Sequence, residues 1–329
     1  MASLVAAFGS SHSPALNSPL EDFAGHVRRD EQFQHHLDRE GRRTSYSQLV
    51  RDAAASIQRE IEPSTLAGRI AACDANIKTL QRAIRAARLD AIVIVGDDQR
   101  EQYFEDNMPA FLVYCGETIR NQPLPADDGS PAYWRRARSQ YHEAELARDY
   151  PVDAALARHM VEHLVAHDFD VSYSDALSRE RGEGHAFGFV HRRLLDGETL
   201  PIVPVVVNTY YPPNQPRPAR CYRFGQALRK AIESWPQQQR VGVIASGGLS
   251  HFTIDEELDR LVLDSMRNRD ENALASIAPA KLNNGSSEIR NWIVTAGAAE
   301  CLDPQWQEYV PFYRSPAGTG CGMAFAVWG

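Results

Sequence analysis

Three runs of continuously apolar residues constrain the fold of this chain more than any other feature. They lie at 91–95, 202–207 and 241–245, and none contains a polar side chain. A strand with one face in water alternates polar and apolar residues, whereas a strand covered on both faces does not. The runs therefore predict a sheet whose two faces are both covered by helices.

Further strand-like and helical segments alternate with these runs along the chain. Shorter apolar runs occur at 4–8, 110–114 and 323–327. Helical spacing is expected at 66–88, 151–167, 224–234 and 255–279, and Pro151 suits the first turn of a helix. This alternation favours a three-layer α/β/α fold with a central mixed, mostly parallel sheet flanked by helices.

The chain shows no clear linker, so we expect one domain over residues 1–329. The polar stretch at about 15–65 mixes short helix signals with turns and is interpreted as an irregular insertion. Residues 208–220 contain four prolines and cannot form a central strand or the interior of a helix. Because this segment follows a buried strand, we expect it to line a pocket.

The composition of the chain indicates which classes of partner the protein can bind and in which cellular compartment we expect it. The 329 residues carry a net charge of −8, which gives no electrostatic support for nucleic-acid binding. Five cysteines without a Cys-x-x-Cys pair indicate reduced thiols in a cytoplasmic protein rather than a disulfide framework or a zinc knuckle. We expect no membrane span, because no stretch of about 18 apolar residues exists, and no secretory signal at the N-terminus.

Polar side chains follow several of the expected strands. His12 follows the run at 4–8, Gln99 follows 91–95, and His251 follows 241–245; His185 and Glu257 lie near other element ends. Open α/β sheets place their chemistry at the carboxyl ends of the strands. Histidine is the commonest metal ligand, and two histidines with one carboxylate and open positions are typical of non-heme Fe(II) sites for oxygen chemistry. Together these residues indicate a mononuclear metal pocket.

Each of these residues also has a structural explanation. His12 and His185 could be buried histidines that hydrogen-bond a loop, and acidic residues such as Glu257 are favoured at a helix start by the helix dipole. The polar residues around Gln99 could form an ordinary turn. In the proline-rich segment, three residues are candidates for contact with a substrate, and they could equally be loop surface: Tyr210, Arg217 and Arg220.

Five segments, in this order, resemble the class III extradiol ring-cleavage dioxygenases, the superfamily of the protocatechuate 4,5-dioxygenase β subunit. They lie at 10–14, 95–99 with 107–111, 184–188, 246–251 and 285–292. The insertion at 15–65 and the Gly-Asp-Asp-Gln turn look most similar to single-chain relatives that act on gallate-type substrates, such as 3-O-methylgallate dioxygenases.

The resemblance implies extradiol cleavage of a catecholic or gallate-type aromatic acid with Fe(II) and O2, in a protein that assembles as a homo-oligomer, such as a dimer. It implies that His12 and Glu257 are iron ligands, with Glu256 one register away. It further implies that His185 is the acid/base beside the metal and that His251 lies near the pocket, with a less clear role.

The chain departs from the family pattern at Gln99, which stands where the second iron histidine is usual. A neutral amide oxygen would be a weaker ligand, or another histidine could replace it, with His185 the first candidate and His35 or His36 behind it. The departure also leaves room for a non-oxidative or metal-independent hydrolase, lyase or isomerase on the same scaffold. A protein that keeps the pocket without chemistry is the third possibility.

Overall fold

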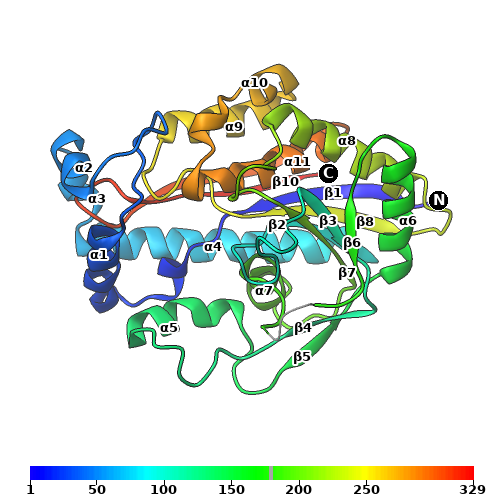
Figure 1. The fold of residues 1–329 in the computed structure, drawn as a ribbon, viewed down its shortest axis with the longest axis horizontal. Helices are drawn as coiled ribbons and strands as arrows, with labels where there is room; N and C mark the ends of the chain where they lie inside the picture. Colours follow the sequence, from blue (N-terminus) through cyan, green and yellow to red (C-terminus); the bar gives the residue numbers. More distant parts are fainter. Residues whose placement is uncertain (178–180) are drawn as a thin grey trace.

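The computed structural model describes residues 1–177 and 181–329. It confirms the three-layer α/β/α fold, with a mixed eight-stranded sheet between two layers of helices (Figure 1). The strands of this sheet are, in chain order, β1 (Ser3–Ser10), β2 (Ala91–Asp97), β3 (Phe111–Tyr114), β6 (Ser172–Ser174), β7 (Ile202–Val207), β8 (Arg240–Ser246), β9 (Pro304–Tyr313) and β10 (Gly320–Trp328). A separate antiparallel pair is formed by β4 (Thr118–Asn121) and β5 (Arg148–Pro151).

The strand order places four parallel strands at the centre of the sheet. The order is β6-β3-β7-β2-β8-β1-β10-β9. Strands β7, β2, β8 and β1 run parallel to one another, so their carboxyl ends meet at one edge. Strand β10 is antiparallel to β1, which brings its first residues to the same edge. This edge is where the sequence placed the candidate chemistry.

The two helical layers pack on opposite faces of the sheet. The helices are α1 (Phe23–Gln32), α2 (Tyr46–Asp52), α3 (Ile57–Glu60), α4 (Pro63–Ala87), α5 (Ala132–Arg138), α6 (Ala154–Ala166), α7 (His185–Phe189), α8 (Pro218–Glu233), α9 (Glu256–Asn268), α10 (Glu271–Ala275) and α11 (Ile289–Ala299). Helices α6 and α8 to α11 form one hydrophobic core with the sheet, and α4 and α7 form the other (Figure 1). Val93 and Val95 face the first core, Ile92 and Ile94 the second. This alternation explains why the run at 91–95 is apolar throughout.

The expected helices form, with differences at their ends. Pro151 is wrong as a first-turn residue: it ends β5, and α6 begins after Asp153, whose side chain accepts a hydrogen bond from the Leu156 amide. Helix α8 begins at Pro218, inside the segment expected to be a loop. The segment 255–279 breaks into α9 and α10 at Arg269, which adopts a left-handed conformation.

The stretch at 15–65 is ordered as short helices joined by turns. Two 3-10 turns precede α1, and α2 and α3 follow before the long helix α4. Helix α1 contributes residues to the cavity described below.

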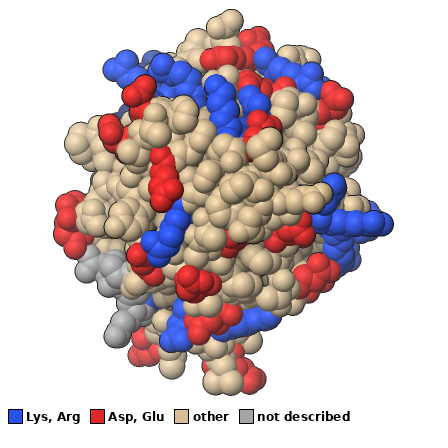
Figure 2. All heavy atoms as spheres, turned by 90° about the vertical axis from the view of Figure 1, so that its right-hand side faces the viewer, with Lys and Arg blue, Asp and Glu red and all other residues tan. Residues whose placement is uncertain are grey.

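The face shown in Figure 2 carries basic and acidic residues interspersed over its described part. Among the described helices, none has both the length and the apolar character needed to cross a bilayer.

Candidate active site

A cavity of about 330 Å³ opens at the carboxyl edge of the sheet. Four of its residues follow four adjacent strands: Tyr210 after β7, Gln99 after β2, His251 after β8 and His12 after β1. His185, the first residue of α7, also lines the cavity. The structure thus brings together five of the residues that the sequence indicated.

His12 presents an unpaired ring nitrogen inside this cavity. Its Nδ1 lies 3.3 Å from the Ser246 hydroxyl, which itself donates to the Ala186 carbonyl at 2.7 Å. The hydroxyl therefore accepts from Nδ1–H, and this assigns a lone pair to Nε2, a buried atom with no hydrogen-bond partner in the described structure. Burial, assisted by the nearby charge of His185, lowers the pKa of His12 to about 3. His12 is consequently a neutral imidazole with a free lone pair, the form that binds metals.

The carboxylate at the centre of the site is Glu288, and the structure does not bring Glu257 to the cavity. Glu257 is exposed in the first turn of α9. Glu288 is 2% exposed and precedes α11. Its Oε2 accepts a hydrogen bond of 2.7 Å from the Gly248 amide, and its Oε1 accepts one of 2.9 Å from Gln99 Nε2. The acidic side chain beside His12 therefore comes from the segment at 285–292.

A second carboxylate, Asp97, lies beside Glu288 and was missed from the sequence. Asp97 is fully buried at the end of β2, and it accepts hydrogen bonds from Asn291 at 3.1 Å and from Gln99 at 3.4 Å. Burial and the neighbouring charge of Glu288 raise the pKa of Asp97. Burial alone would also raise the pKa of Glu288, but the charge and hydrogen bond of His251 lower it. Glu288 is thus the ionised member of the pair.

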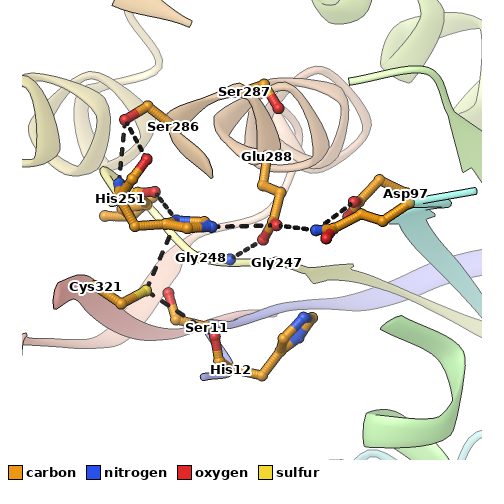
Figure 3. A network of polar contacts seen from close by, with 12 residues as sticks. Ser11, His12, Asp97, Gly247, Gly248, His251, Ser286, Ser287, Glu288 and Cys321 are labelled. Atoms are coloured by element: carbon orange, nitrogen blue, oxygen red, sulfur yellow. Dashed lines mark hydrogen bonds and ion pairs between the residues drawn. The ribbon is translucent and has the colours of Figure 1, made fainter. Parts of the chain in front are cut away.

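His251 is bound on both sides of its ring (Figure 3). Its Nε2 lies 3.2 Å from Glu288 Oε1, and its Nδ1 lies 2.8 Å from the Leu249 carbonyl. Both partners are acceptors, so both nitrogens carry a proton. Burial opposes this charge, but Glu288 outweighs it, and the pKa of His251 is raised well above its ordinary value. His251 is an imidazolium that fixes the orientation of Glu288.

His185 forms a second histidine–carboxylate pair with Glu101. Nδ1 of His185 lies 2.8 Å from a Glu101 oxygen, and its backbone N–H donates to the same carboxylate. Burial lowers the pKa of His185, but the charge and hydrogen bond of Glu101 outweigh it and raise the pKa to about 10. The ring centroids of His12 and His185 are 5.1 Å apart, in an edge-to-face arrangement. The cavity therefore holds a neutral and a protonated imidazole side by side.

The proline-rich segment contributes less to the cavity than expected. Tyr210 lines it, as predicted. Arg217 is exposed and begins the turn into α8, and Arg220 packs over the Phe169 ring and donates to the Asp168 carbonyl. Neither arginine reaches the cavity, because the chain enters α8 at Pro218 and carries both side chains away. Among residues 1–177 and 181–329, the arginines that line the cavity are Arg29, Arg138 and Arg314.

The donor set at the sheet edge fits a divalent metal ion. Asp97, His185 and Glu288 each place one potential ligand atom within 4.8 Å of the others, and of these three the two carboxylates can bind an ion while His185 stays protonated. His12 adds the unpaired Nε2 described above. Gln99 lies between the two carboxylates and directs its amide nitrogen toward them. Imidazole with carboxylate oxygen is the ligand combination typical of non-heme iron and related metals.

Fold and cavity together place the chain in the class of α/β proteins whose candidate active site lies at the carboxyl edge of a sheet. Residues 54–322 match the family model described as the catalytic LigB subunit of aromatic ring-opening dioxygenase. The match covers well over half of the chain, and the chain belongs to this family. The resemblance inferred from the five sequence segments is confirmed.

Curated relatives share part of the chain. A gallate dioxygenase of Pseudomonas putida is 36% identical over 182 residues, which are 51% of this chain and 51% of that protein. A 2,3-dihydroxyphenylpropionate/2,3-dihydroxicinnamic acid 1,2-dioxygenase of Comamonas testosteroni is 27% identical over 182 residues, 55% of this chain and 49% of the relative. The chain therefore spans about half the length of the curated relatives it matches.

Proposed function

We propose that this protein cleaves the ring of a catecholic or gallate-type aromatic acid next to its hydroxyl groups, using Fe(II) and O2. The single observation that carries this proposal is the unpaired, buried Nε2 of neutral His12 in a cavity that also holds the ionised carboxylate of Glu288. Family membership and the names of the relatives support the class of reaction.

In the proposed site, His12 and Glu288 hold the metal, and Asp97 or the Gln99 amide oxygen supplies a further ligand. Gln99 can do so by turning its amide, since its nitrogen now bridges the two carboxylates. His185 is a poor ligand below its raised pKa, because a protonated imidazole has no lone pair. When bound, Fe(II) supplies Lewis-acid activation of the ring hydroxyls and the one-electron chemistry that O2 requires.

Two side chains of the cavity can hold a proton and donate it to the substrate during the reaction. Glu101 fixes Nδ1 of His185, so the proton at Nε2 is the one available to a substrate oxygen. With a pKa near 10, His185 holds that proton at neutral pH and acts first as an acid. Tyr141 is a second donor, since its buried hydroxyl has no hydrogen-bond partner in the described structure and burial raises its pKa. Its ring packs edge-on against His12 and His185, at centroid distances of 5.6 and 5.8 Å.

Anaerobic loading with Fe(II) tests the proposal. The loaded protein should consume O2 with catechol, protocatechuate or gallate, and should form a yellow semialdehyde from the first two and a product with two new carboxylates from gallate. The His12→Ala variant should lose both the iron and the turnover. An iron-free sample that stays fully active would instead favour the metal-independent alternative. A sample that binds these compounds without consuming oxygen would favour a protein that keeps only the pocket.

A further inference from the structure

Arg29 contributes a cationic group without an anionic partner to the cavity wall. The residue lies on α1, and its guanidinium carbon is 3.9 Å from the centroid of the Trp134 ring. Within residues 1–177 and 181–329, no carboxylate or carbonyl accepts a hydrogen bond from this guanidinium. A guanidinium that stacks on an indole by its face keeps its N–H edge free for another group.

Each described carboxylate of the cavity wall is already paired with a basic side chain of that wall. Asp30 and Arg314 form two hydrogen bonds of 2.8 Å, with both side chains largely buried. The two other wall carboxylates that the structure describes, Glu101 and Glu288, are each bound to a histidine. No described carboxylate of the wall is therefore left to neutralise Arg29, and the unoccupied charge favours an anionic ligand.

Arg138 provides a second donor on the same wall. Its guanidinium contacts Asp128, but that carboxylate also accepts a hydrogen bond of 2.8 Å from Arg135. The single negative charge of Asp128 is thus shared between two arginines. The Nε of Arg138 is buried and has no hydrogen-bond partner in the described structure. A buried donor left unpaired costs free energy, which a ligand acceptor would recover.

We propose that Arg29, assisted by Arg138, binds the carboxylate of the aromatic substrate and so selects ring acids over rings without a carboxylate. This inference rests on the proposed function, since it orients the same substrate in the same cavity. A planar carboxylate matches the fork of a guanidinium through two parallel hydrogen bonds. The ring hydroxyls would then lie toward His12 and Glu288, with the carboxylate at the Arg29 side of the cavity. Arg29 takes the role that the sequence had suggested for Arg217 and Arg220.

A binding measurement tests the subsite without any turnover. Calorimetric titration of the metal-free protein should show 4-hydroxybenzoate binding more tightly than 4-hydroxybenzamide, which has the same ring but no charge. The Arg29→Gln variant should lose about 10- to 100-fold in affinity for the acid and little for the amide. Arg29→Lys should recover part of the loss, and Arg28→Gln, an exposed neighbour outside the cavity, should bind like the parent protein.

Turnover by the iron-loaded protein gives the second readout. Arg29→Gln should raise KM for gallate about 10-fold or more while KM for pyrogallol, which lacks the carboxylate, changes less than about 2-fold. Equal losses for both compounds, or unchanged binding of the acid by Arg29→Gln, would overturn the subsite. If the parent protein selects the acid through Arg29 in the titration yet cleaves no ring, the subsite stands and only the dioxygenase proposal fails.

Discussion

Nε2 of His251 lies 3.2 Å from Oε1 of Glu288, and this ion pair joins the loop after β8 to the residue that precedes α11. The partners are 37 residues apart in the chain. Each residue shifts the pKa of the other toward its charged form, despite burial that opposes both charges. The pair therefore keeps an ionised carboxylate inside a cavity where an isolated one would take up a proton.

Replacing Glu288 tests which carboxylate binds the metal. Glu288→Gln should weaken Fe(II) binding by at least about 100-fold, because it removes the anionic ligand while keeping the shape of the side chain. Glu257→Gln is the matched control and should bind iron like the parent protein, since Glu257 is exposed on α9. Iron content after anaerobic gel filtration measures both variants. The reverse pattern, with iron lost only in Glu257→Gln, would return the ligand role to that residue.

Replacing Glu101 should move the alkaline limb of the pH profile. Glu101→Gln removes the charge that raises the pKa of His185, so that pKa falls from about 10. The proton on His185 is then lost at lower pH, and kcat should decline at a pH at least about one unit below that of the parent. Glu105→Gln, which alters an exposed ion pair with Arg100, is the control. An unshifted alkaline limb would mean that the His185 proton is not used.

A methyl group at Gly285 should disturb His251. A Cβ at this position would overlap both the ring and the carbonyl oxygen of His251. We expect Gly285→Ala to lose about 1–3 kcal/mol of unfolding free energy and most of the turnover. Gly68→Ala has open space in the second turn of α4 and should gain about 0.5–1 kcal/mol. Urea unfolding and oxygen uptake measure both, and a fully active Gly285→Ala would show that the position of His251 is unimportant.

His26 should make the fold sensitive to acid. Burial, with the nearby charge of Arg314, lowers the pKa of this residue to about 4, and its Nε2 bonds Ser18 at 2.8 Å. Below the unfolded value of 6.5, the unfolded chain takes up a proton that the folded protein accepts only near pH 4. Unfolding is thus favoured as the pH falls through this window, by about 3 kcal/mol at its lower end.

The comparison of His26→Gln with His35→Gln isolates this effect. His35 is exposed, so its replacement should leave the acid dependence of the unfolding free energy unchanged. His26→Gln should reduce the loss of stability between pH 6.5 and pH 4, measured by urea unfolding at several pH values. An identical pH dependence in the two variants would contradict the role of His26.

The sequence predicted the central strands because burial on both faces leaves a continuous apolar run. Helix α11 was not predicted. Every residue of Ile289–Ala299 is buried, so the segment lacks the polar face that makes a surface helix recognisable in a sequence. Strand β9 was not predicted because this edge strand is partly exposed and interrupted by Pro311. Neither element has the alternating or helical spacing of apolar residues by which strands and helices are recognised in a sequence.

His12 and His251 were predictable from their place after strands, whereas the carboxylate was not. Glu257 has the position of any acidic residue at a helix start, and Glu288 precedes a helix in the same way. Only the packing of α11 against the sheet decides which of them is buried beside His12. The sole local signal was the segment at 285–292, which had already contributed to the family resemblance.

The walls of the cavity come from positions as distant as His12 and Cys321. The cavity exists only when nearly the whole chain is folded, so a ligand that binds in it stabilises the folded state. A ligand present at about 100 times its Kd would add about 2.7 kcal/mol to the folding equilibrium. Melting curves recorded across a collection of aromatic acids would then rank candidate substrates before any reaction is observed.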